Sequence, residues 1–204
     1  MAPGDGQRNL VPRFTSIPRG HHTSLSFRAK TFQTIYTPGH AQHHNAYWLS
    51  SENAVFAGDV ASVIIGDGPS VPPFPPPDTH LEFWKQLRDR IRALRPASIY
   101  VTRSGKISSP LPMLDDFEHR LFAWADWIKQ RLLEEKPDSE IIHEFQAFVK
   151  QSLVAVGVNP QNLLTYEQAV PPAMSVAGLN RYWKKIPSRT SASSKSLEKR
   201  GHAL

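Results

Sequence analysis

Between residues 32 and 59, hydrophobic positions alternate with polar ones in short runs, a pattern typical of β-strands. Residues 32–36 alternate as a half-buried strand does, and Pro38-Gly39 interrupts the run. Residues 46–49 and 54–57 predict two further strands, separated by a polar turn. The segment is therefore predicted to form three consecutive strands joined by turns.

From residue 79 onward, apolar positions recur every three or four residues, which predicts helices. Thr79-x-x-Glu82 is a capping-box pattern, and it opens a helix that is expected to end before Pro96. The apolar face of this helix consists of Leu81, Trp84, Leu87, Ile91 and Leu94. A short strand over 98–102 follows. Helix and then strand, after the earlier strands, is what an α/β layer requires.

Beyond Pro112 the sequence predicts a helical region. One apolar stripe covers about 114–132 and stops at Pro137, and a second begins near Asp138 and ends at Gly157. A third, shorter stripe follows Pro171-Pro172. Aromatic residues on these stripes are interpreted as core.

Composition divides the chain into four parts. Residues 1–30 are rich in Gly, Pro, Ser and Arg and hold no regular period, so they are predicted to be a disordered or loosely ordered tail. Residues 31–110 contain the strands and the first helix, and 111–186 form the helical C-terminal region. Residues 187–204, rich in Ser, Lys and Arg, predict a disordered basic tail.

Two polar groups stand on turns that directly follow predicted strands. Thr37-Pro38-Gly39-His40 follows the first strand and Gly58-Asp59 follows the third. Because strand, turn and strand return the chain to the same edge, His40 and Asp59 are predicted to lie close together. Imidazole and carboxylate are metal ligands, although such a pair is also common as a plain turn contact. The chain has no cysteine, so any metal must be bound by His, Asp, Glu and water.

This arrangement resembles the second half of the metallo-β-lactamase fold, whose members carry a Thr-Pro-Gly-His turn and then a Gly-Asp turn after a hydrophobic strand. Residues 37–40 and 56–59 match that pattern, and the resemblance covers roughly 32–185. It implies an α/β fold: a partial αββα sandwich followed by a helical C-terminal region. It also implies that His40 binds zinc or another divalent metal and that Asp59 bridges two such ions.

Two other motifs of the family differ in this sequence. The first signature, His-x-His-x-Asp-His, supplies two or three ligands and orients the attacking water, and it occurs nowhere in the chain. The late histidine that follows a strand is replaced by Arg103, whose guanidinium stays protonated and cannot bind a cation. His44 and Arg103 are candidates for residues that support the ligands or face the substrate. His21 and His22 are candidates for the missing metal ligands. Because they are adjacent, their side chains would point to opposite faces of a strand, so they are not expected to reach the same ion.

The formal charge of +6 raises the question of nucleic-acid binding. Residues 1–30 carry +4 and 187–204 carry +3, which leaves −1 for the body between them. The basic character thus belongs to the tails, and no specific nucleic-acid partner is expected.

No run of about 18 apolar residues exists, so no membrane span is expected. The polar N-terminus lacks a secretory signal, and a cytoplasmic location is expected.

The resemblance implies metal-dependent hydrolysis of a small-molecule substrate such as a thioester, lactone, phosphoester or β-lactam. The primary hypothesis is a truncated or degenerate hydrolase with impaired activity. The alternative is a non-catalytic binding or regulatory remnant that associates with a partner chain. Half of a two-sheet sandwich leaves an apolar sheet face exposed, which favours a homo-oligomer or a partner that covers it.

Overall fold

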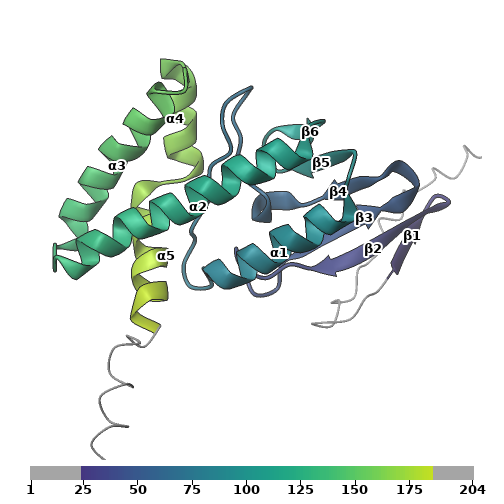
Figure 1. The fold of residues 1–204 in the computed structure, drawn as a ribbon, viewed down its shortest axis with the longest axis horizontal. Coiled ribbons are helices and arrows are strands. Elements are labelled where there is room, and N and C mark those ends of the chain that lie inside the picture. The colour runs from purple at the N-terminus through teal and green to yellow at the C-terminus, as the bar shows by residue number, and fades with distance from the viewer. Residues whose placement is uncertain (1–23, 186–204) are drawn as a thin grey trace, which may run out of the picture.

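The computed structural model describes residues 24–185, which form one mixed β-sheet and five α-helices (Figure 1). The six strands follow one another in the sheet in chain order. They are β1 (Ser24–Phe27), β2 (Lys30–Tyr36), β3 (Asn45–Leu49), β4 (Ala54–Phe56), β5 (Ser98–Val101) and β6 (Gly105–Ile107). The α/β class that the sequence predicted is confirmed.

The pairing of the strands combines a meander with one parallel crossover. Strands β1 to β4 pair antiparallel, β4 and β5 pair parallel, and β6 returns antiparallel to β5. The crossover between the parallel strands contains helix α1 (Leu81–Leu94). Two parallel strands that are neighbours in a sheet need a long crossover connection, and here α1 provides it.

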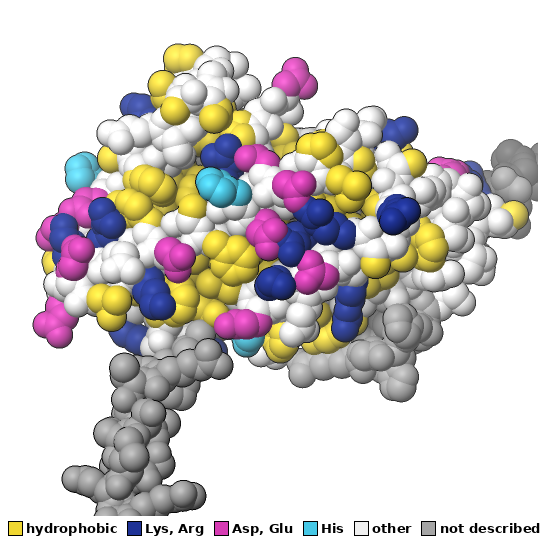
Figure 2. Space-filling model, viewed as in Figure 1, with side chains coloured by type: hydrophobic (Ala, Val, Ile, Leu, Met, Phe, Trp, Pro, Cys, Tyr) yellow, Lys and Arg dark blue, Asp and Glu magenta, His cyan; other side chains and the backbone are white. Residues whose placement is uncertain are grey.

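Helix α1 and helix α2 (Pro110–Leu133) cover the same face of the sheet (Figure 1). Ion pairs between Arg88 and Glu118 and between Arg92 and Asp115 join the two helices. On the surface of this layer, acidic and basic side chains are interspersed rather than gathered into one basic patch (Figure 2). The remaining helices, α3 (Asp138–Val154), α4 (Pro160–Ala169) and α5 (Pro172–Lys185), pack beyond one end of the sheet.

The two faces of the sheet differ in what they contact. Val55 and Ile99 pair across β4 and β5, point to the helix layer and are fully buried. Phe32, Phe56 and Tyr100 belong to the opposite face and are only partly buried. The rings of Phe56 and Tyr100 are stacked at 4.6 Å, and Phe32 meets Phe56 edge-on at 5.8 Å. We call these three side chains the aromatic face, and among residues 24–185 no helix lies over it (Figure 1).

The expected strands and the first helix appear close to their predicted bounds, and three elements were not predicted. The short strand β6 follows the turn at Arg103 and pairs with β5. Strand β1 lies within the part assigned to the N-terminal tail, where Ser24 to Phe27 pair with β2. Helix α4 buries little more than Tyr166, so its apolar stripe is weak in the sequence. Residues 1–23 of the predicted tail, and the predicted basic tail, lie outside the described residues.

The capping box predicted at the start of α1 is wrong. The helix begins after His80, which makes no side-chain capping bond. Thr79 instead donates its hydroxyl to the Pro75 carbonyl at 2.9 Å, and Glu82 accepts a hydrogen bond from Tyr182 of α5 at 2.7 Å. Contacts with the preceding loop and with α5 therefore replace the local cap.

No helix in residues 24–185 has both the length and the apolar character that crossing a bilayer requires.

Helix α5 holds the proline-rich loop at 72–78 through a very close approach of the backbone. A Cβ atom added to Gly178 would lie 2.1 Å from the carbonyl oxygen of Phe74. Phe74 is itself fully buried. The loop next to the sheet edge is therefore positioned by the helical region as well as by the sheet.

We expect Gly178→Ala to lower the free energy of unfolding by about 1–3 kcal/mol, because the added methyl group meets backbone atoms. In a helix without this close contact, replacing glycine by alanine would raise the free energy of unfolding by up to about 1 kcal/mol, because alanine has the higher helix propensity. The control is Ala177→Gly, at an exposed neighbouring position, which measures the difference in helix propensity between alanine and glycine alone. Urea unfolding of both variants checks the prediction, and a more stable Gly178→Ala protein would contradict the close approach.

Candidate metal centre

The loop that follows β2 holds His40 at one end of the sheet. The backbone N–H of Thr37 donates to the His44 carbonyl at 3.0 Å and closes the loop. Gly39 has φ +141°, and a Cβ atom there would lie 3.1 Å from Cγ of Trp84. Both the positive φ and the close contact favour glycine. His40 follows directly, with its ring edge-on to that of Trp84 at 6.4 Å.

The turn that follows β4 places Asp59 at the same end of the sheet. The N–H of Ala57 donates to the Tyr100 carbonyl at 2.8 Å, which extends the parallel pairing by one residue. Gly58 has φ +59°, and a Cβ atom there would lie 3.0 Å from Nε2 of His44. Glycine therefore allows the two turns to approach each other. Asp59 lies in the short 3₁₀ helix Gly58–Val60.

The structure brings His40 and Asp59 together, as the order of strands predicted. Nε2 of His40 lies 3.9 Å from Oδ2 of Asp59, and the side chains are 20% and 34% exposed. Nδ1 of His40 and Oδ1 of Asp59 are buried and have no hydrogen-bond partner within residues 24–185. The pair therefore has unused capacity for a ligand or for water. Its role as a metal site stays a prediction.

Burial keeps both nearby histidines uncharged at neutral pH. It lowers the pKa of His40, although the Asp59 carboxylate acts in the opposite direction. It lowers the pKa of His44 from 6.5 to about 4, and neighbouring His40 adds to the effect. Neutral imidazoles can bind a metal, whereas imidazolium cannot. The carboxylate of Asp59 consequently has no full ion pair with either ring.

His44 supports the loop from within. Its Nδ1 lies 2.7 Å from the hydroxyl of Thr37, which is fully buried, and its Nε2 faces Gly58. The rings of His44 and His40 are 6.2 Å apart. By contrast, His43 is exposed. The role of His44 as a residue that supports the ligands or faces the substrate stays a prediction.

Arg103 lies on the turn after β5 and is exposed, with φ +80°. Its neighbour Thr102 approaches the site, since the Thr102 hydroxyl lies 3.8 Å from the Cβ position of Gly58. The turn thus borders the site, but no contact joins the guanidinium to His40 or Asp59. A role for Arg103 on the substrate side stays a prediction.

The described residues fit a zinc ion only in part. Zinc bonds to nitrogen and oxygen are about 2.0–2.2 Å long, so one ion could contact both His40 and Asp59 across 3.9 Å. A catalytic zinc site uses about three protein ligands. Within residues 24–185 no group of three or more His, Asp or Glu side chains is arranged to hold a metal. This part of the chain alone therefore does not complete a catalytic site.

Sequence reasoning missed three residues that shape the site. Thr37 hydrogen-bonds His44, Trp84 packs against Gly39, and the Asp78 carboxylate accepts the Gln42 N–H at 3.3 Å. The proline-rich loop that carries Asp78 thus passes the edge of the candidate site. The sequence marked Thr37 only as part of a turn and Trp84 only as core, since neither carries a signal for its contact with the loop.

The sequence matches no protein-family model and no curated protein. Among solved structures, it is similar to an archaeal metallo-beta-lactamase superfamily protein from Sulfolobus tokodaii (25% identity, 48% of this chain and 36% of that chain, TM-score 0.41). A metallo-beta-lactamase family protein from Thermus thermophilus gives 22% identity over 57% and 38%, with a TM-score of 0.45. A metallo-beta-lactamase from Pontibacter korlensis gives 12% over 50% and 46%, with a TM-score of 0.39. The chain spans less than half the length of each of these proteins.

We expect acid to destabilise the protein through His44. Between pH 6.5 and about 4 the unfolded chain binds a proton at His44 that the native state does not, so stability falls as the pH falls through this window. The loss should be on the order of 2–3 kcal/mol. Urea unfolding at pH 7, 5 and 4, with chelator present, measures it.

The variant His44→Gln should lose less stability over the same pH range, whereas His119→Gln, at an exposed position on α2, should behave as the wild type. Equal pH slopes for all three proteins would show that His44 is not held in its neutral form.

Proposed function

We propose that this chain contributes part of the site of a metal-dependent hydrolase of the metallo-β-lactamase type. The observation that carries the proposal is the His40–Asp59 pair, 3.9 Å apart. A buried nitrogen of the histidine and a buried oxygen of the aspartate have no hydrogen-bond partner in the described part of the chain. A partly buried carboxylate beside two neutral imidazoles favours a divalent cation, because the cation would supply the missing positive charge. Zinc suits this set of donors.

The proposal includes at least one further ligand from outside residues 24–185, because no third His, Asp or Glu side chain in that range is arranged with the pair to hold a metal. It would come from another segment of polypeptide at the same end of the sheet. The aromatic face is a surface that such a segment could cover, since Phe32, Phe56 and Tyr100 are only partly buried. The substrate would be a small molecule with a hydrolysable ester, thioester, lactone or phosphoester bond.

One observation favours a second candidate function, a binding module without catalysis. Arg103 stands on the turn that borders the site, at the position where the family places a further metal ligand, and arginine cannot bind a cation. In this case the chain would keep the fold without catalysis, and its function would be to bind a partner. The two candidates differ in whether a chelator-sensitive hydrolysis can be measured.

We expect the protein, purified without chelator, to bind about one zinc ion per chain, and we expect His40→Ala or Asp59→Ala to weaken zinc binding at least about 10-fold. Loss of either side chain removes one of only two described ligands. Zinc titration calorimetry, together with the metal content measured by mass spectrometry, provides the test. The same samples are then assayed for thioester and phosphoester hydrolysis with and without chelator.

His43→Ala is the matched control, since His43 belongs to the same loop but is exposed. It should bind zinc as the wild type does. A wild-type protein with no affinity for zinc would overturn the proposed metal site. Zinc binding with no chelator-sensitive hydrolysis would instead support the binding module.

A further inference from the structure

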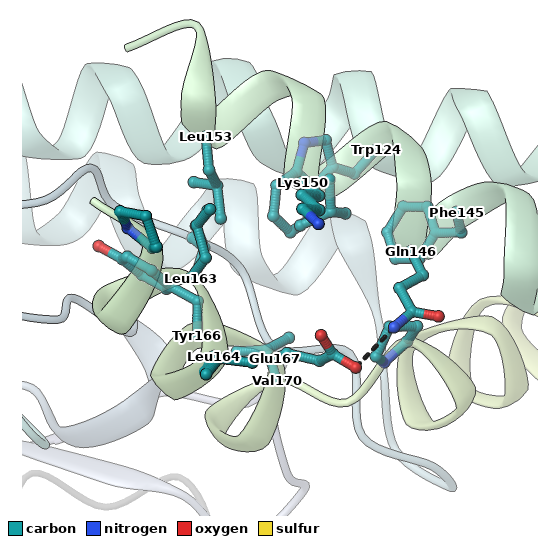
Figure 3. Close-up of a pocket in the computed structure, with 14 residues that line it drawn as sticks. Trp124, Phe145, Gln146, Lys150, Leu153, Leu163, Leu164, Tyr166, Glu167 and Val170 are labelled. Carbon is teal, nitrogen blue, oxygen red and sulfur yellow. Dashed lines mark hydrogen bonds between the residues drawn. The ribbon is translucent and has the colours of Figure 1, made fainter. Parts of the chain in front are cut away.

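A second candidate site lies inside the helical region. A cavity of about 270 Å³ separates α3 from α4, with side chains of α3 on one side and of α4 on the other (Figure 3). None of the residues that line it belongs to the His40–Asp59 site. Its walls are mainly apolar and include Trp124, Phe145, Val149, Leu153, Leu163 and Val170. Well-formed apolar pockets with a few polar groups are typical ligand sites.

Most of the polar groups around this cavity already have partners. The hydroxyl of Tyr166 donates to the Pro69 carbonyl at 2.7 Å and accepts the Ile65 N–H at 3.1 Å. Gln146 donates its amide to the Glu167 carboxylate at 2.6 Å (Figure 3). These groups are therefore poorly placed to take a new hydrogen bond from a ligand.

Lys150 is the exception. It projects from α3 beside the cavity (Figure 3). The ion pairs around this helix join Arg131 and Lys136 to Glu144, and within residues 24–185 no carboxylate forms an ion pair with Lys150. A lysine can pack its hydrocarbon stem against apolar walls and keep its ammonium group at the rim. The rim thus offers two charges above an apolar chamber, the Lys150 ammonium and the Glu167 carboxylate, and of these only the carboxylate has a side-chain hydrogen-bond partner within residues 24–185, the Gln146 amide.

We propose that this cavity binds a small apolar carboxylate, of the size of a short-chain fatty acid. The hydrocarbon part would lie against Trp124 and Phe145, and the carboxylate would meet Lys150 at the rim. The volume lies just below the ~300–1,000 Å³ of typical ligand pockets, which favours a short chain over a long one. Burial of hydrocarbon supplies most of the affinity, and the exposed ion pair supplies the preference for an anion.

The test uses the full chain and three probes with the same hydrocarbon chain: octanoate, octanol and octylamine. Titration calorimetry measures binding, and tryptophan fluorescence gives a second readout because Trp124 lines the cavity. We expect octanoate to bind with a dissociation constant of about 1 mM or tighter. Octanol should bind more weakly and octylamine most weakly.

Two kinds of variant locate the site. Lys150→Gln should weaken octanoate about two- to five-fold and leave octanol unchanged, as expected for an exposed ion pair. Leu163→Phe fills the cavity from α4 and should abolish binding of both. Val149→Phe fills the cavity from α3 and replaces Leu163→Phe as the test if that variant does not fold. Circular dichroism checks the folding of both variants. Lys85→Gln, on the exposed surface of α1, should bind as the wild type does.

Each contrary result overturns a stated part of the proposal. If octanoate does not bind up to about 10 mM, the cavity is not a carboxylate site. Equal binding of octanoate and octylamine would exclude recognition by Lys150. Unchanged binding in a folded cavity-filling variant would place the ligand elsewhere. The double variant His40→Ala, Asp59→Ala should keep octanoate binding, so failure of the metal proposal and failure of this one are distinguishable.

Discussion

One buried side chain, Trp84 of α1, joins the helix layer to both turns of the candidate site. It is 1% exposed, and its indole N–H donates to the Val60 carbonyl at 2.8 Å, directly after Asp59. On the other side it packs against Gly39, directly before His40. Its ring also meets Phe74 and Phe117 edge-on. The crossover helix therefore does more than connect parallel strands, because its core residue sets the separation of the two turns.

The chemistry of the site follows from this packing. Two close approaches, at Gly39 and Gly58, bring a histidine and an aspartate to one end of the sheet, and the same burial keeps the imidazoles neutral. The carboxylate is left without a full counter-charge. In a low-dielectric setting such an arrangement attracts a cation, although two ligands alone hold it weakly. The pair therefore remains a candidate metal site, and within residues 24–185 no third side chain is arranged to complete it.

The helical region has two separate consequences. Through Gly178 it holds the loop at 72–78, whose Asp78 contacts the backbone of the histidine loop. Through α3 and α4 it encloses a cavity that shares no lining residue with the His40–Asp59 site. Of the residues of α4, only Tyr166 is fully buried, while Leu163 and Ala169 are partly buried against the core. The region therefore both supports the first candidate site and creates the second.

The sequence by itself determined the strands around residues 32–57, the amphipathic helix that ends before Pro96, and the approach of His40 to Asp59, because these depend on local periodicity and strand order. It missed β1, β6 and α4, whose apolar patterns are weak, and it misplaced Thr79 as a cap. Only the tertiary structure decided that Thr37 supports His44 and that Lys150 has no ion-pair partner among the described residues. Such contacts join residues that no regular spacing in the sequence relates, so they can be known only from the packing of the folded chain.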